Sequence, residues 1–272
     1  MSSSLPRREF LARSLATGAA GAVAASTASR LAEAAPQANA PRQVYELGLY
    51  QMAAGDMLHK ADDYFQQAFI PALKRAGVGP VGVFVESSKA DAPVVYTLIP
   101  HAGWESVATL RTALQNDAEY QKAGAAFLAA PPMDLAYVNH EARLMLAADF
   151  MPALAVPEKL ETRVFELRRY RNPSEAAFRK KLEMFGAGGE VTIFRRVGLN
   201  PVFFGEMLFG PDMFNITYML AYPDAAARGK AWGGFGKDAD WQKLRATPGY
   251  TDPEIIANIK SLTLKPTAYS EI

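Results

Sequence analysis

The stretch that decides the fold is Val44-Tyr45-Glu46-Leu47-Gly48-Leu49-Tyr50, because it returns as Val164-Phe165-Glu166-Leu167-Arg168-Arg169-Tyr170. The two stretches lie 120 residues apart and share valine, glutamate, leucine and tyrosine at matching positions. Both are rich in residues that favour extended backbone. We therefore expect each of them to open a repeated unit with a β-strand.

Three further blocks of sequence recur in the same order. The pairs are Ala76–Val81 with Val197–Val202 at an offset of 121 residues, Asn116–Lys122 with Lys237–Lys243 at 121, and Leu144–Leu146 with Leu262–Leu264 at 118. Blocks that keep both their order and their spacing indicate a tandem duplication. The chain is therefore expected to hold two copies of one structural unit.

Each copy has the same coarse order of elements: strand, helix, two strands, helix and a closing strand. The order β-α-β-β-α-β predicts a ferredoxin-like module, an antiparallel sheet with both helices on one face. We place the modules at 42–154 and 162–272. The opposite faces of the two sheets can bury each other. The sequence thus predicts an α+β fold of tandem ferredoxin-like modules packed as a pseudo-dimeric α/β barrel.

The start of the chain resembles an export signal. Pro6-Arg7-Arg8-Glu9-Phe10-Leu11-Ala12 is similar to the twin-arginine pattern, and the Ala- and Gly-rich stretch 14–28 is only mildly hydrophobic. Cleavage after a small-x-small triplet is expected after Ala34 or Ala40, with Ala34 preferred. Residues 1–40 are therefore interpreted as a signal peptide and short linker, and the protein as periplasmic or otherwise exported.

Composition narrows the classes of function. The 272 residues include 29 Lys and Arg, 28 Asp and Glu, and no cysteine. Without a basic excess the chain has little with which to neutralise phosphates, so we expect no nucleic-acid partner. Lack of cysteine excludes disulfides and thiolate chemistry. Apart from the weak Ala/Gly stretch near the start, no apolar run is long enough for a stable membrane span.

The chain also resembles a known family. Val44–Tyr50, the Asp238-Ala239-Asp240-Trp241-Gln242-Lys243 block and the closing segment 259–267 are similar to the NIPSNAP domain, over residues 42–272. The first copy departs from the family pattern, with Gly48 where arginine is usual. The resemblance implies the dimeric α/β-barrel superfamily, which includes haem-binding proteins and cofactor-independent monooxygenases. Inferring a function from that fold is an argument by analogy.

The opening strands carry the candidate ligand-binding residues. Side chains alternate along a strand, so Glu46 and Tyr50 share one face, and Glu166, Arg168 and Tyr170 share the corresponding face of the second copy. We expect this face to point into the space between the two sheets, where it could bind a polar ligand. The alternative is an internal Glu166–Arg168 salt bridge that only satisfies buried charge.

The chain has three histidines, none at a spacing typical of a metal site. His59 is expected on a solvated helix face. His101 follows a predicted strand and His140 precedes one, and a single histidine can hold haem iron. His101 is therefore added to the ligand-binding candidates. No metal site is predicted, no cofactor is required, and haem is the one cofactor that remains open.

Three hypotheses for the function follow. The first is an exported NIPSNAP-like protein that binds a small ligand or a protein partner in the cleft between the two sheets. The second is a small-molecule monooxygenase or haem-linked enzyme of the barrel superfamily. The third is a scaffold for protein association, with homo-oligomerisation open. Catalytic residues are not identified, and the sequence does not decide whether the protein is an enzyme.

Overall fold

The computed structural model describes residues 41–53, 55–87 and 92–272. The chain divides into two compact units, 1–35 and 36–272, and the described residues all belong to the second. The predicted export signal lies outside the described residues. In the described part of the chain, no helix is both long and apolar enough to cross a bilayer.

The strands form a closed barrel in the order β1-β3-β2-β8-β5-β7-β6-β4, with antiparallel neighbours throughout. Their bounds are β1 Val44–Gln51, β2 Gly82–Glu86, β3 Val94–His101, β4 Asn139–Ala147, β5 Val164–Arg171, β6 Asn200–Phe209, β7 Asn215–Tyr222 and β8 Asn258–Pro266. Closure leaves no unpaired sheet edge, which removes the usual route to edge-to-edge aggregation.

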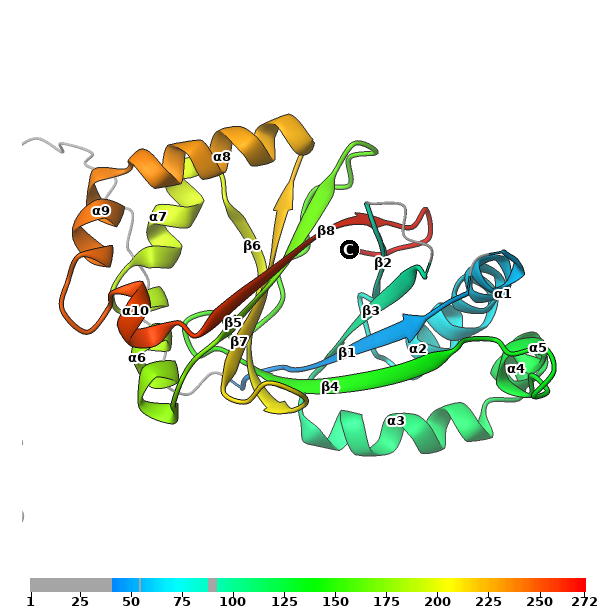
Figure 1. The fold of residues 1–272 in the computed structure, drawn as a ribbon. Coiled ribbons are helices and arrows are strands. Elements are labelled where there is room, and N and C mark those ends of the chain that lie inside the picture. Colours follow the sequence, from blue (N-terminus) through cyan, green and yellow to red (C-terminus); the bar gives the residue numbers. More distant parts are fainter. Residues whose placement is uncertain (1–40, 54, 88–91) are drawn as a thin grey trace, which may run out of the picture. The chain divides into compact units, whose positions relative to one another are not determined.

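Helices lie outside the barrel, on both sides of the strands (Figure 1). In the first half they are α1 Asp56–Tyr64, the π-helix η1 Phe65–Phe69, α2 Ile70–Arg75, α3 Trp104–Asn116, α4 Ala118–Ala123 and α5 Ala125–Leu128. In the second half they are α6 Glu175–Phe185, α7 Glu190–Val197, α8 Ala225–Lys237, α9 Ala239–Arg245 and α10 Asp252–Ile255.

The barrel consists of two four-stranded sheets of identical order. The first half of the chain gives β4-β1-β3-β2 and the second gives β8-β5-β7-β6. Each has the strand order of a ferredoxin-like sheet. The sheets join where β2 pairs with β8 and β4 pairs with β6. The predicted α+β fold with a pseudo-dimeric barrel is confirmed.

Three apolar clusters follow from this arrangement. One fills the barrel interior, and it includes Tyr45, Leu47, Phe84, Phe165, Phe203 and Met219. A second lies between the first sheet and its helices, and a third between the second sheet and its helices. The strands are therefore covered by helices on one face and by the barrel interior on the other, except at the starts of β4 and β8, which are exposed.

The strand pairing corrects one detail of the repeat. Met145 pairs with Tyr45, and Leu264 pairs with Phe165, the counterpart of Tyr45. Met145 and Leu264 are therefore equivalent, at an offset of 119 residues. The expected offset of 118 for this block was wrong by one residue, and such a shift places every side chain of the strand on the other face.

The stretch Asn172-Pro173-Ser174-Glu175 predicts a helix start capped by Asn172, and this prediction needs a correction. Ser174, and not Asn172, is the N-cap, and its side chain accepts a hydrogen bond from the backbone N–H of Ala177. Asn172 instead donates to the carbonyl of Ile255 at 2.6 Å. Pro71 predicts a kink or division near the end of the first module's first helix, and η1 does separate α1 from α2, with Pro71 in the first turn of α2.

One end of the barrel is filled by segments outside the strands. Ile272 is fully buried in the interior cluster, and Leu154 packs against the same cluster. The backbone N–H of Ala155 donates to the carbonyl of Val202, near the start of β6. The segment between the two modules and the residues after β8 therefore close this end, and a cavity can form only toward the other.

The barrel interior should dominate stability. Phe165 is fully buried, and its ring centroid lies 4.9 Å from that of Phe84 across the joined sheets. We expect Phe165→Ala to lower the free energy of unfolding by about 3–5 kcal/mol, because it removes a buried ring and leaves a cavity. Urea denaturation followed by circular dichroism measures this change.

Phe209→Ala is the matched control, because Phe209 is 64% exposed. Its cost should stay within about 0.5 kcal/mol. Equal costs for the two variants would contradict the packing described for the barrel interior.

Candidate functional site

A cavity lies inside the barrel at the end where β1 and β5 finish. Its volume is about 170 Å³. Its apolar wall comes from both sheets and consists of Leu47, Leu49, Tyr96, Leu167 and Leu262. These side chains alternate along their strands with residues that face the helices, so the barrel closure itself brings them together.

Three cationic residues line the same cavity: Arg143 on β4, Arg169 on β5 and Lys260 on β8. All three also line a wider depression of about 520 Å³, together with Glu141, Ala142, Pro211 and Asp212. The cations thus stand where the apolar interior meets the surface. The loop between β6 and β7 contributes Pro211 and Asp212 to this rim.

The rim carries more positive than negative charge. Arg143 forms an ion pair with Glu141 at 2.8 Å, and Arg169 forms one with Asp212 at 2.7 Å. Among the described residues, Lys260 has no ion pair within 4 Å. Burial lowers the pKa of Arg169, and the nearby positive charge of Arg143 lowers it further, against the effect of Asp212. An anion at the rim would relieve this repulsion.

The predicted candidate residues do not line this cavity. Tyr45 and Leu47 point into the barrel, whereas Glu46 and Glu166 face the helices. The expectation that the Glu/Arg/Tyr face points between the sheets was therefore wrong. The physical reason is that both faces of these strands are buried, and the helices supply polar partners for the charged face.

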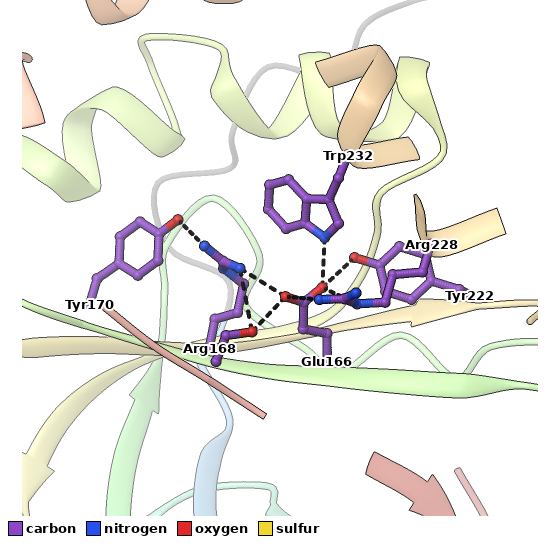
Figure 2. Close-up of polar contacts among 7 residues, drawn as sticks. Glu166, Arg168, Tyr170, Tyr222, Arg228 and Trp232 are labelled. Atoms are coloured by element: carbon purple, nitrogen blue, oxygen red, sulfur yellow. Dashed lines mark hydrogen bonds and ion pairs between the residues drawn. The ribbon is translucent and has the colours of Figure 1, made fainter. Parts of the chain in front are cut away.

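Glu166 is the centre of a hydrogen-bond network under α8 (Figure 2). Its side chain is completely buried. It accepts hydrogen bonds from Arg168 at 2.8 Å, Tyr222 at 3.0 Å, Trp232 at 2.6 Å, Ser261 at 2.6 Å and the Nε and Nη2 of Arg228, both at 3.0 Å. Six donors therefore saturate this carboxylate.

The network also fixes Arg168 and Tyr170. Arg168 donates to the hydroxyl of Tyr170 at 3.1 Å, and its guanidinium lies 4.5 Å from the ring centroid of Trp232. The alternative hypothesis, an internal Glu166–Arg168 salt bridge, agrees with this geometry. A ligand-binding role for Glu166, Arg168 or Tyr170 remains an untested prediction.

The charge state of Glu166 follows from its partners. Burial alone would raise the pKa of this carboxyl group, but the hydrogen bonds from Arg228, Ser261 and Trp232 outweigh burial and lower the pKa to about 2. Glu166 is therefore ionised at any physiological pH. Its position suits a structural anion and does not suit a general base near neutrality.

The first module lacks this network. Glu46 keeps 22% of its side-chain surface exposed, and its carboxylate lies 3.6 Å from Nε2 of the fully buried His101. Nδ1 of His101 lies 3.1 Å from the hydroxyl of Ser106. Tyr50 stacks on His140 with ring centroids 4.0 Å apart. The structure therefore brings Glu46, Tyr50 and His101 to one helix-facing region of the first sheet.

His101 does not fit the role of a haem ligand. Its two ring nitrogens face Ser106 and Glu46, and its side chain has no exposed surface. A porphyrin has no room between Nε2 and a carboxylate at 3.6 Å. Within the described residues, no group of three or more His, Cys, Asp or Glu side chains is arranged to hold a metal ion.

Sequence reasoning missed the cavity residues Arg143, Arg169 and Lys260. The second opening strand does contain a signal, because Arg169 lies on the same face of the strand as Phe165 and Leu167. Once the apolar face is assigned to the barrel interior, the arginine at its end marks the rim. The donors Arg228 and Trp232 were also missed, because they lie more than 60 residues from Glu166 along the chain.

Comparison with known sequences supports the NIPSNAP resemblance for the second half of the chain. Residues 165–271 match the NIPSNAP family model. This span runs from β5 to beyond β8. The resemblance expected over residues 42–272 thus has sequence support in the second predicted module. No curated protein matches the chain significantly.

Solved structures support the barrel fold. A monooxygenase-like protein of Fusobacterium nucleatum subsp. nucleatum superposes with a TM-score of 0.54 at 9% identity, covering 83% of this chain and 92% of that chain. A monooxygenase-like protein of Lactobacillus acidophilus superposes with a TM-score of 0.54 at 7% identity, covering 83% of this chain and 94% of that chain. A NIPSNAP-like domain protein of Burkholderia xenovorans superposes with a TM-score of 0.37 at 17% identity, covering 41% of this chain and 91% of that chain. The likeness to the first two structures, at identities under 10%, shows the fold alone.

The Glu166 network gives a test of stability against pH. The folded-state pKa of about 2 lies below the usual value of a glutamate. Ionised Glu166 therefore stabilises the fold by about 3 kcal/mol above pH 5, and this contribution is lost as pH falls from about 5 toward 2. We expect Glu166→Gln to cost about 3–5 kcal/mol at pH 7, because two partly buried arginines lose their anion.

Glu46→Gln is the matched control at the equivalent position of β1. Among the described residues, the Glu46 carboxylate accepts no hydrogen bond, so this variant should cost less than about 1 kcal/mol. Urea unfolding at pH 7 and pH 3 measures both. Equal losses in the two variants would show that the network has no special role in stability.

Proposed function

We propose that the protein binds a small amphipathic anion inside the barrel, with the apolar part of the ligand in the cavity and its acidic group at the rim. The proposal rests on one observation: the same cavity is lined by apolar side chains and, at its rim, by Arg143, Arg169 and Lys260. This location agrees with the expected site between the two sheets, although different residues line it.

The cavity favours an apolar ligand body. Leu47, Leu167 and Leu262 supply the wall, and each comes from the interior-facing side of its strand. Burying an apolar chain there is worth about 25 cal/mol per Å² removed from water. The volume of about 170 Å³ limits the enclosed part of the ligand to a short chain or a single ring.

The rim favours a negatively charged head group. Lys260 is free of ion pairs among the described residues, and each rim arginine has further N–H donors beyond its one carboxylate partner. Within the part of the chain that the structure describes, the buried Nε of Arg143 has no hydrogen-bond partner. A carboxylate can take two N–H donors from one guanidinium, which makes arginine well suited to such a ligand.

Calorimetric titration with octanoate, octan-1-ol and octylammonium tests both parts of the proposal. Octanoate should bind, octan-1-ol should bind roughly tenfold more weakly because it lacks the charge, and octylammonium should not bind. Leu262→Trp should abolish octanoate binding by filling the cavity. Equal affinity for all three probes, or binding unaffected by Leu262→Trp, would contradict the proposed site.

Lys260→Met separates a specific contact from the effect of net charge. It should weaken octanoate binding roughly tenfold. Lys265→Met is the matched control, since Lys265 is exposed on the same strand and alternates onto the opposite face from Lys260. It should leave octanoate binding unchanged, and an equal loss in both variants would mean that only overall charge matters.

The alternative function is a small-molecule monooxygenase of the same superfamily. It rests on the fold shared with the monooxygenase-like structures, at identities under 10%. Oxygen consumption with aromatic and quinol substrates tests it, and the absence of turnover would leave ligand binding as the better account. Protein association and homo-oligomerisation remain untested predictions.

Export through the twin-arginine pathway is part of the proposal. Its support is the sequence of residues 6–12 with the Ala- and Gly-rich stretch behind it. Arg7→Lys with Arg8→Lys should retain the protein in the cytoplasm of its own host, whereas Arg30→Lys should not. Fractionation with immunoblotting measures this, and unchanged export of the double variant would overturn the assignment.

A further inference from the structure

The two modules have a glutamate at the same strand position, but only the second module surrounds it with hydrogen-bond donors. Glu46 and Glu166 occupy equivalent positions in β1 and β5, paired with Ile99 and Leu220 at matching registers. Glu166 accepts six hydrogen bonds. In the part of the chain that the structure describes, the Glu46 carboxylate accepts none, and its nearest ionisable group is His101 at 3.6 Å.

Each donor residue of the Glu166 network can be traced to its counterpart in the first module, and Tyr222 on β7 corresponds to His101 on β3. Arg168 and Ser261 correspond to Gly48 and Ala142 by strand pairing. The helices α3 and α8 both have 13 residues and follow equivalent strands. The fourth residue of each is Val107 and Arg228, and the eighth is Arg111 and Trp232.

The replacement at the fourth helical position is the most informative. In the second module, Arg228 holds both carboxylate oxygens of Glu166 through Nε and Nη2 at 3.0 Å. In the first module the equivalent residue is the shorter, half-buried Val107, whose side chain has no hydrogen-bond donor. Glu46 is 22% exposed, so a group from solvent can reach it.

Two further observations show that this region is polar and incompletely satisfied. Among the described residues, the buried Nε2 atom of His101 has no hydrogen-bond partner, and it lies 3.6 Å from the Glu46 carboxylate. His140 lies beside Gly48, with Nε2 3.5 Å from where a Cβ on that glycine would stand. Thr97 blocks the path that the stem of Arg168 takes in the second module, with Oγ1 2.3 Å from the same point.

We propose that Glu46 of the first module is a second binding site, which takes a guanidinium or ammonium group of an external ligand in the place that Arg228 fills in the second module. The ligand class follows from the carboxylate that must be neutralised and from the guanidinium that neutralises its counterpart. This site faces the helices and is separate from the barrel cavity, whose cationic rim repels the same ligand.

An NMR titration with methylguanidinium chloride tests the proposal, with sodium chloride at equal ionic strength as reference. Backbone amide signals of β1 and of the start of α3 should shift and saturate, and those around Glu166 should not. Signals that follow ionic strength alone, or shifts confined to the second module, would overturn the proposal without any variant.

Variants at two positions sharpen the test. Glu46→Gln should weaken binding roughly tenfold or more, because it removes the charge that the ligand meets. Val107→Arg should abolish binding and raise the melting temperature, because it restores the arginine of the second module in the same helical position. Val107→Met, which adds bulk without charge, should not raise the melting temperature. Binding that survives both Glu46→Gln and Val107→Arg would overturn the site.

Arg111 is a nearby arginine that could satisfy Glu46 from within the chain. It stands at the position of Trp232, is exposed, and influences the pKa of His140. Arg111→Gln should leave methylguanidinium binding within about twofold of the wild type. If binding appears only in Arg111→Gln, then Arg111 itself occupies the carboxylate, and the proposed external ligand is refuted. Lys260→Met should leave this binding unchanged.

Discussion

The pairing of the two sheets at both of their edges is the constraint on which the rest of the structure depends. When β2 meets β8 and β4 meets β6, the uncovered faces of the two ferredoxin-like sheets become one enclosed interior. The strands then lie between the helices and the barrel interior. Barrel closure therefore creates the apolar core, and at one end it also gathers residues from six different strands around a cavity.

Duplication made this architecture and then allowed its halves to diverge. The second module saturates Glu166 with donors from the four elements β5, β7, α8 and β8, whereas the first keeps the glutamate and has other residues in place of those donors. The second module is thus a structural reference for the first. Residues of both modules are needed for the cavity, because Arg143 comes from β4 and Lys260 from β8.

The fold was predictable from the sequence because the repeat of Val44–Tyr50 at Val164–Tyr170 indicates two copies of one structural unit. The orientation of those strands was not predictable. Alternation identifies two faces, but both are buried here, and the charge of Glu166 is satisfied by Arg228 and Trp232, which lie far along the chain. Only closure of the barrel shows that Leu47 and Leu167 face the interior and that Arg169 ends at its rim.

A crystal structure of the protein with octanoate tests the central claim most directly, namely that the enclosed interior between the two sheets is the ligand site. The account predicts the alkyl chain among Leu47, Leu167 and Leu262, with the carboxylate within hydrogen-bond distance of the rim cations. An octanoate bound outside the barrel, or its carboxylate turned inward and away from Arg143, Arg169 and Lys260, would contradict it.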